Sequence, residues 1–276
     1  MKLVRYETVD GAEGVGIVGD DGNSVVATGY VDLPAFIAAG QDAWTAAERS
    51  LDDDHPSVEV RRLLAPHPQP GKMLFLGRTF RAFRQGLSDD APPFVYSRVA
   101  SSIVGPEEAI RMPGPSETVL YEGELLIIIG RAGRRIAASD AASHIFGYTQ
   151  VNDITWTDWI HGSDDALPQI SMGKNADTFC PMGPEVITAD SFDVTDARCT
   201  VSVNGDVSSV TSLSDMAWSL ARLIEWLSQD MTLWPGDVIA TGTSEAKPIV
   251  VGDEVIVQFD GFRPLVNQVV PGWRDD

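Results

Sequence analysis

One apolar run, VLYEGELLIIIG at residues 119–130, constrains the fold of this chain more than any other stretch. Aliphatic and β-branched residues dominate it, which is typical of a strand buried in a sheet. Glu122 and Glu124 interrupt this pattern. Because residues two positions apart in a strand point to the same face, about 6.6 to 7 Å apart, these two side chains lie together while Gly123 faces the other way.

Two carboxylates this close in a low-dielectric site repel each other, so either one is protonated or a cation lies between them. Hard ions such as Mg²⁺ bind carboxylate oxygens at about 2.0 to 2.1 Å, and we expect a third carboxylate nearby. Asp153, at the end of the strand-like run FGYTQVND, is the best candidate. The pattern alone leaves an alternative, in which this face is exposed and the glutamates only add solubility.

The first 65 residues are predicted to form a small β-rich unit. Residues 1–28 alternate polar and apolar side chains around Asp21-Gly22, a dipeptide suited to a hairpin turn. Residues 32–51 are predicted to be helical, and residues 58–64 to form a second short helix. The prolines of APHPQPGK cannot continue a helix, so we place the domain boundary there, between the ranges 1–65 and 66–276.

The larger region is predicted to consist mainly of strands. Residues 214–229 show the spacing of an amphipathic helix, with Ser214 or Asp215 as its N-cap. Residues 78–93 have no strong periodicity and are expected to form a loop or lid. The expected strands are 73–77, 94–96, 119–129, 147–152, 186–187, 200–203, 238–240 and 254–259.

Charge and composition exclude several classes of partner. The net charge is −20, so nucleic acid and anionic membrane surfaces are repelled. No run approaches the roughly 20 apolar residues of a membrane span, and the N-terminus lacks the apolar segment of a secretory signal. We therefore expect a cytoplasmic protein with no nucleic-acid or membrane partner, in which Cys180 and Cys199 are reduced and buried.

Several motifs, found in a fixed order, resemble the fumarylacetoacetate hydrolase family. They cover most of residues 73–270 and read YEGELLIIIG, FGYTQVNDIT, GKNADTFCPMGPEVIT, SVNGDV and WPGDVIATGTS. The resemblance implies an α+β, mostly β fold, a mixed β roll beside a small N-terminal β-rich domain, assembled as a homodimer. It also implies that Mg²⁺, Mn²⁺ or Ca²⁺ is held by Glu122, Glu124 and Asp153.

The same resemblance implies a substrate and roles for three further residues. Family members typically act on 2-oxo or β-diketo acids, so a small carboxylic acid is the expected partner. Lys174, in GKNADTF, matches a lysine that would stabilise an enolate oxygen, and Arg98 and Thr243 would anchor the substrate. The alternative for Lys174 is a surface ion pair, although the flanking Gly173 and the motif match favour a site role, and a hydroxyl such as that of Thr243 in a turn is just as often a local cap.

The chain also departs from the family pattern. Hydrolytic members carry G-x-N-Y-x-x-H-x-x-E after the first strand of this region, whereas this chain reads GRTFRAFRQG. Phe83 stands at the histidine position and Gly86 at the glutamate position, so the base that activates water is missing. Phe80 and Phe83, with Trp156 and Trp159, are candidate walls of a less polar pocket, although the tryptophans fit the core or a dimer interface equally well.

A catalytic role would require another base. His161 closely follows the predicted metal site in sequence, and we name it with Lys174 as a candidate catalytic residue. A lone histidine is, however, commonly structural. Asp89 and Asp90, in the 78–93 loop, are further candidates.

These observations predict a divalent-metal-dependent enzyme that cleaves a C–C bond of a 2-oxo or β-diketo acid, by decarboxylation or hydrolysis. Two alternatives stay open. One is a hydratase, dehydratase or keto–enol isomerase on the same scaffold, and the other is a non-catalytic homologue that binds metal and ligand. The sequence leaves the natural substrate, the ion, the general base and the dimer interface undecided.

Overall fold

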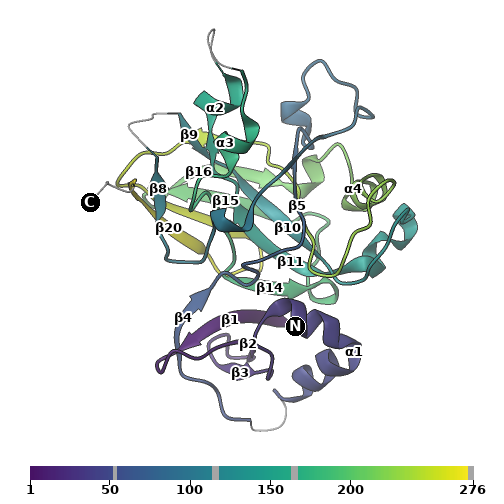
Figure 1. Ribbon diagram of the computed structural model, residues 1–276, viewed down its shortest axis with the longest axis vertical. Coiled ribbons are helices and arrows are strands. Elements are labelled where there is room, and N and C mark those ends of the chain that lie inside the picture. Colours follow the sequence, from purple (N-terminus) through teal and green to yellow (C-terminus); the bar gives the residue numbers. More distant parts are fainter. Residues whose placement is uncertain (52–54, 114–117, 163–166, 273–276) are drawn as a thin grey trace.

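A ten-stranded sheet runs through the molecule from the N-terminal unit into the larger region (Figure 1). The computed structural model describes residues 1–51, 55–113, 118–162 and 167–272. The strand order is β3-β2-β1-β14-β11-β10-β17-β5-β6, and β4 also pairs with β1. The strands are β1 (Lys2–Thr8), β2 (Glu13–Val18), β3 (Val25–Ala27), β4 (Val60–Leu64), β5 (Met73–Gly77), β6 (Phe94–Ser97), β10 (Gly123–Ile129), β11 (Ile145–Asn152), β14 (Glu185–Thr188) and β17 (Val238–Ala240).

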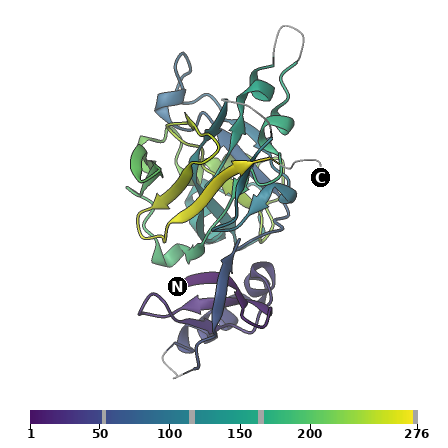
Figure 2. The same cartoon turned by 90° about the vertical axis from the view of Figure 1, so that its left-hand side faces the viewer.

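A second, five-stranded sheet packs against β10 and β11 of the first. Figure 2 shows its two C-terminal strands in yellow across the larger region. In order, its strands are β16 (Asp206–Ser212), β15 (Arg198–Val203), β19 (Glu254–Phe259), β20 (Leu265–Pro271) and β8 (Ile110–Met112). Shorter pairings join β12 (Thr155–Trp156), β9 (Val119–Tyr121) and β18 (Lys247–Pro248), and β13 (Cys180–Pro181) with β7 (Ile103–Val104).

The described residues form few helices, and all except α1 are short, which confirms the predicted α+β, mostly β class. Within the described ranges, no helix has the length and apolar character needed to cross a membrane. The α-helices are α1 (Leu33–Arg49), α2 (Thr157–His161), α3 (Ile170–Lys174) and α4 (Leu220–Leu227). The 3-10 turns are η1 (Arg81–Phe83), η2 (Ala100–Ser102), η3 (Ala138–His144), η4 (Ala189–Ser191) and η5 (Leu213–Asp215).

The N-terminal unit lies below the larger region in Figures 1 and 2 and shares its main sheet, because β1 pairs with β14. The prediction of a helix at residues 58–64 is wrong. Residues 60–64 form β4, which pairs antiparallel with β1 and is held there by hydrogen bonds from Arg61 and Arg62 to the Glu7 carboxylate. Tertiary pairing overrides local propensity here.

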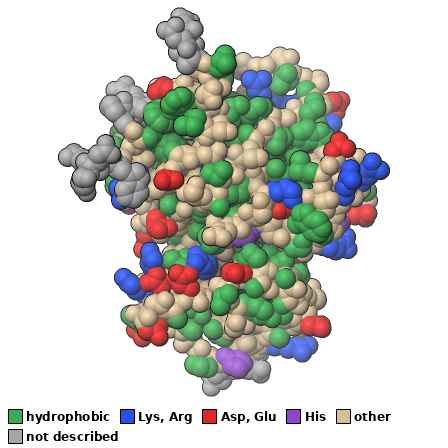
Figure 3. All heavy atoms as spheres, viewed as in Figure 1, with side chains coloured by type: hydrophobic (Ala, Val, Ile, Leu, Met, Phe, Trp, Pro, Cys, Tyr) green, Lys and Arg blue, Asp and Glu red, His purple; other side chains and the backbone are tan. Residues whose placement is uncertain are grey.

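Charged side chains of both signs are interspersed on the face drawn in Figure 3.

The two longer predicted helices both differ in form from the prediction. The helix at residues 32–51 is found as α1, capped by the Asp32 carboxylate and kinked at Gly40, which has φ 79°. The helix predicted at residues 214–229 is shorter than expected. Its first part is η5, and α4 begins only after Ser219, whose hydroxyl accepts a hydrogen bond from Arg222 N.

β10 lies at the centre of the core, with all of its residues buried. Leu125 and Ile127 belong to the larger apolar cluster, whereas Leu126 and Ile128 pack into a second cluster on the other side of the sheet. A Cβ on Gly123 would lie 2.7 Å from Val201 Cγ2 and 2.8 Å from Cys199 Sγ of β15. Glycine at this position therefore allows the two sheets to approach each other.

We expect Gly123→Val to lower the free energy of unfolding by about 1 to 3 kcal/mol, because the new side chain would overpack the contact between the sheets. Urea denaturation measures this change. Val207→Ala is the control, since Val207 is 65% exposed on β16, and it should change stability by less than about 0.5 kcal/mol. Equal effects of the two substitutions would contradict the role assigned to Gly123.

Candidate metal centre

The structure brings the three predicted carboxylates together. Glu122 lies between β9 and β10, Glu124 lies in β10, and Asp153 directly follows β11. Antiparallel pairing of β10 with β11 aligns Gly123 with Asn152, and Asp153 N donates a hydrogen bond to Glu122 O at 2.8 Å. One carboxylate oxygen from each acid lies within 4.8 Å of the other two. The strand register therefore creates an acidic centre.

Neighbouring groups hold each carboxylate in place. Thr155 Oγ1 donates to Glu122 Oε1 at 2.6 Å, and the backbone N–H of Gly242 donates to Glu124 Oε2 at 2.9 Å. Glu124 is 1% exposed, so this face of the strand is not the solubilising surface that the pattern alone left open. Preorganised oxygen ligands of this kind suit a hard cation.

Two cations and a tyrosine contact the same centre. Lys174, at the end of α3, places Nζ 3.1 Å from Glu122 Oε2 and 3.2 Å from the carbonyl oxygen of Asp153, and it also donates to the Asp153 carboxylate. Arg98 Nε donates to Asp153 Oδ1 at 2.5 Å, and Arg98 Nη2 donates to Ile154 O at 2.7 Å. The Tyr96 hydroxyl donates to Asp153 Oδ2. Asp153 is therefore the most strongly tied of the three acids.

The pKa shifts reflect this unequal distribution of partners. Burial raises the pKa of Glu124 well above its usual value, and the charges of Asp153 and Glu122 raise it further. For Asp153, burial opposes ionisation, but Arg98 and Lys174 outweigh it and lower the pKa. The pKa of Lys174 is raised despite its burial, because Asp153 and Glu122 stabilise the ammonium form. Lys174 is therefore charged near neutral pH.

Charge balance provides a test of whether a metal ion fits this centre. Three carboxylates face two cations, Lys174 and Arg98, so one negative charge remains uncompensated when all groups are ionised. Burial is the main cause of the raised pKa of Glu124, and this excess of negative charge raises the pKa further. A divalent ion would neutralise it and leave a net positive charge for an anionic ligand. The oxygen-only donor set fits Mg²⁺, and also Mn²⁺ or Ca²⁺.

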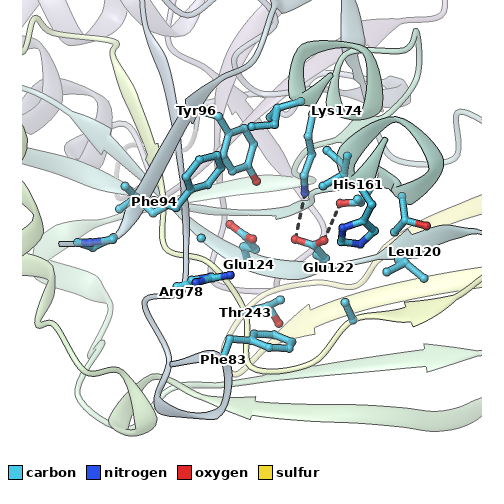
Figure 4. A pocket seen from close by; sticks show the side chains of 18 of the residues that line it. Arg78, Phe83, Phe94, Tyr96, Leu120, Glu122, Glu124, His161, Lys174 and Thr243 are labelled. Carbon is cyan, nitrogen blue, oxygen red and sulfur yellow. Dashed lines mark hydrogen bonds and ion pairs between the residues drawn. The ribbon is translucent and has the colours of Figure 1, made fainter. Parts of the chain in front are cut away.

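The acidic centre opens into a cavity of about 830 Å³. Figure 4 shows Glu122 and Glu124 side by side, with Lys174 and His161 at the Glu122 end. One wall is apolar and comes largely from the loop between β5 and β6. The side chains that line the cavity include Arg78, Phe83, Leu87, Pro92, Phe94, Tyr96, Leu120, Thr157, Ile160, His161, Ile170, Lys174 and Thr243.

Several predicted site residues lie at this cavity and others do not. Phe83, His161, Lys174 and Thr243 line it. Arg98 has a fully buried side chain bound to Asp153, so it supports the acidic centre and is not placed to contact a ligand in the cavity. Phe80 is 0% exposed and its side chain packs in the apolar core, so it is not a wall of the cavity. Its backbone forms an isolated β-bridge with Met216.

The remaining sequence candidates are engaged elsewhere. Trp156 and Trp159 pack edge to face with ring centroids 6.0 Å apart. Asp89 lies 3.7 Å from Arg81 Nε, and Asp90 accepts a hydrogen bond from Arg222 at 3.0 Å. These two aspartates form ion pairs with arginines at the protein surface and do not line the cavity.

Sequence reasoning missed three contributors. Tyr96 lies two residues before Arg98, so strand alternation was a usable signal that both point to one face. Gly242 contributes only a backbone N–H, which no side-chain pattern reveals. Arg78 follows the strand β5 and adopts φ 60°, a conformation uncommon outside glycine.

Fold and site together define a mixed β-roll protein with a buried acidic centre at the base of a ligand-sized cavity. Residues 77–270 match the family described as Fumarylacetoacetate (FAA) hydrolase C-terminal. The chain belongs to the fumarylacetoacetate hydrolase family.

The proteins that are similar to this chain are named for several different activities. The bovine protein named Oxaloacetate tautomerase FAHD2A, mitochondrial, is 32% identical over 98% of this chain and 92% of its own length. The solved structure of 5-carboxymethyl-2-hydroxymuconate delta-isomerase from Mycobacterium smegmatis is 33% identical, with a TM-score of 0.78 over 98% of this chain and 100% of that one. The solved structure of fumarylacetoacetate hydrolase from Exiguobacterium antarcticum is 30% identical, with a TM-score of 0.83 over 98% of this chain and 99% of that one. The cytoplasmic location and the homodimer expected for this chain stay predictions.

Without divalent ions, we expect Glu124→Gln to be more stable than the wild type above the ordinary glutamate range near pH 4.5. A raised folded-state pKa means that wild-type stability falls as pH rises toward that pKa, whereas the amide does not titrate. The advantage should grow by up to about 1.4 kcal/mol per pH unit and vanish near pH 4. Urea unfolding at several pH values measures it.

Added Mg²⁺ should reverse this order near neutral pH, because the ion stabilises the folded wild type by binding and the variant lacks one charged ligand. Asp206→Asn, an exposed acid on β16, is the control and should behave like the wild type. Parallel pH profiles for the wild type and Glu124→Gln would contradict the raised pKa.

Proposed function

We propose that this chain is a divalent-metal-dependent tautomerase or isomerase that interconverts the enol and keto forms of a 2-oxo dicarboxylic acid such as oxaloacetate. The observation that carries the proposal is the charged, buried Lys174 beside the acidic centre, in a cavity where Phe83 stands at the position of the histidine of hydrolytic family members. The names of the relatives favour this reaction over the C–C cleavage expected from the sequence.

The loop between β5 and β6 supports proton transfer over hydrolysis. Phe83 is 44% exposed and lines the cavity at the position where hydrolytic family members carry histidine. Gly86 has φ 80°, a backbone conformation that favours glycine over the glutamate of those members. Hydrolysis requires a base to activate water, whereas tautomerisation only relocates one proton.

Lys174 and His161 are the candidate proton-handling groups. A bound divalent ion would act as a Lewis acid that polarises the 2-oxo group. The Lys174 ammonium is held by Glu122 and Asp153 and would donate a hydrogen bond to the enolate oxygen. The His161 imidazole, at the same end of the centre (Figure 4), would exchange the proton with the adjacent carbon. In the enol-to-keto direction, His161 would take the proton from the enol O–H group and return it to the adjacent carbon, so that a C–H bond forms, C=C becomes a single bond and C–O becomes C=O.

The rest of the cavity would position the substrate. The Thr243 hydroxyl lines the cavity, donates to Glu245 O at 3.0 Å and accepts from Glu245 N at 3.4 Å. It would contact the substrate by turning its O–H group from Glu245 O to an oxygen of the ligand. The apolar wall around Phe83 and Phe94 would exclude water from the reacting carbon. A cavity of about 830 Å³ has room for dicarboxylic acids longer than oxaloacetate.

With Mg²⁺, the purified protein should accelerate the disappearance of enol-oxaloacetate, followed by its ultraviolet absorbance, without releasing pyruvate. Glu122→Ala and chelation of the ion should each lower the rate by at least about 100-fold. Asp206→Ala on the surface of β16 is the matched acidic control and should retain wild-type activity.

Product analysis separates this proposal from its competitors. Release of pyruvate from oxaloacetate would identify a decarboxylase, and hydrolysis of acylpyruvates would identify a C–C hydrolase. An absence of turnover across a panel of short and long 2-oxo dicarboxylic acids, with Mg²⁺ bound, would indicate the non-catalytic homologue.

Lys174→Met should lower kcat by about 100- to 10,000-fold, while Mg²⁺ affinity should stay the same or increase, because a competing positive charge leaves the acidic centre. Turnover assays and calorimetric Mg²⁺ titration measure the two effects separately. Lys247→Met, which removes an exposed lysine, is the control. A parallel loss of Mg²⁺ binding and activity would show that Lys174 only maintains the fold of the centre.

A further inference from the structure

The cavity wall that comes from the loop between β5 and β6 has little packing to hold it in place. Phe83 and Leu87 of this loop both line the cavity, and they are 44% and 39% exposed. Side chains this exposed bury little apolar surface, so the hydrophobic effect adds little to the stability of the loop. The path of this segment therefore depends on hydrogen bonds.

Arg84 lies inside the same loop and is buried, with an exposure of 3%. Its Nη1 donates to the carbonyl oxygen of Arg78 at 2.7 Å, and its Nη2 donates to the carbonyl oxygens of Ser88 and, at 2.7 Å, Ala91. One guanidinium thus joins the beginning of the loop to two points near its end. Because all three partners are backbone carbonyl groups, these bonds fix the path of the main chain. Arg84 itself does not line the cavity.

The far end of the loop is also attached to the segment around the start of α4. Trp218 Nε1 donates to the carbonyl oxygen of Asp89 at 2.7 Å, and Arg222 Nη2 donates to Asp90 Oδ1 at 3.0 Å. The Arg222 guanidinium lies over the Trp218 ring, 3.8 Å from its centroid. These contacts anchor the far end to the body of the protein, and Arg84 connects that end with the beginning of the loop.

We propose that Arg84 is a positioning residue that holds the loop between β5 and β6 as a preformed wall of the cavity. Without its guanidinium, the loop would spend only part of the time in the conformation that places Phe83 and Leu87 at the cavity. The apparent affinity for a ligand would fall by that fraction, whereas a bound ligand would meet the same acidic centre. The expected effect on KM rests on the proposed function, but the expected effect on the order of the loop does not.

Hydrogen exchange followed by mass spectrometry measures the order of the loop directly, in the purified full chain without any ligand. Arg84→Ala should speed the exchange of loop amides by about 10- to 100-fold, because three hydrogen bonds are lost. Among these amides are the N–H groups of Leu87 and Ala91, which are hydrogen-bonded within the loop. Peptides from β10 and β11 should exchange at the wild-type rate, which also shows that the variant is folded.

Kinetics with Mg²⁺ and oxaloacetate test the consequence for the cavity. Arg84→Ala should raise KM by about 10- to 100-fold and change kcat by less than about threefold. Calorimetric titration should show an unchanged Mg²⁺ affinity, because the acidic centre belongs to other elements. A general loss of folded protein would instead lower kcat and leave KM unchanged.

Arg84→Lys keeps the positive charge, but its single nitrogen cannot form the forked set of bonds, so its exchange rates and KM should fall between those of the wild type and Arg84→Ala. Arg81→Ala is the matched control, because Arg81 belongs to the same loop, is exposed and does not line the cavity. It should leave the exchange rates and both kinetic constants unchanged.

Three outcomes would overturn the inference. Wild-type exchange in the loop of Arg84→Ala would show that the loop keeps its conformation without the guanidinium. Faster exchange in β10 and β11 as well, in both Arg84 variants, would show that Arg84 supports the whole fold. Faster loop exchange with an unchanged KM would show that binding does not need an ordered wall. A wild type that does not convert oxaloacetate would instead contradict the proposed function, and hydrogen exchange would still test Arg84.

Discussion

Partial neutralisation of three buried carboxylates by two cations is the interaction on which the site depends. Arg98 and Lys174 both bind Asp153, so this acid is ionised, whereas Glu124 retains an elevated pKa because burial and its acidic neighbours oppose its charge. Full neutralisation would leave no reason for a metal ion, and no neutralisation would make the centre too costly to bury. The surplus of one negative charge makes the centre suited to a divalent ion and then to an anionic substrate.

The scaffold that maintains this balance is assembled from distant parts of the chain. β10 and β11 bring Glu122 and Glu124 beside Asp153, and the end of α3 delivers Lys174. Burial of β10 between two apolar clusters fixes the positions of these groups, since rotation or slippage of the strand would expose several aliphatic side chains. The packing that stabilises the fold therefore also holds the geometry of the centre.

The loop between β5 and β6 decides what this centre can do. Phe83 presents an aromatic ring to the cavity where the pattern of hydrolytic family members has a histidine, and for this reason the function that we propose moves a proton and does not activate water. Arg78, at the start of the same loop, also lines the cavity. One short segment thus shapes much of the cavity wall, while the acidic centre lies at its base.

The sequence alone determined the elements whose signal is local: the buried strand around Leu125, the Glu122 and Glu124 pair with its alternation, and the motifs that led to Asp153 and Lys174. Tertiary structure decided everything that depends on pairing between distant segments. Residues 60–64 form a strand because they pair antiparallel with β1. Tertiary structure also placed Arg98 behind Asp153, buried Phe80 in the core and exposed Arg78 to the cavity, because burial and charge pairing are set by neighbours far away in the chain.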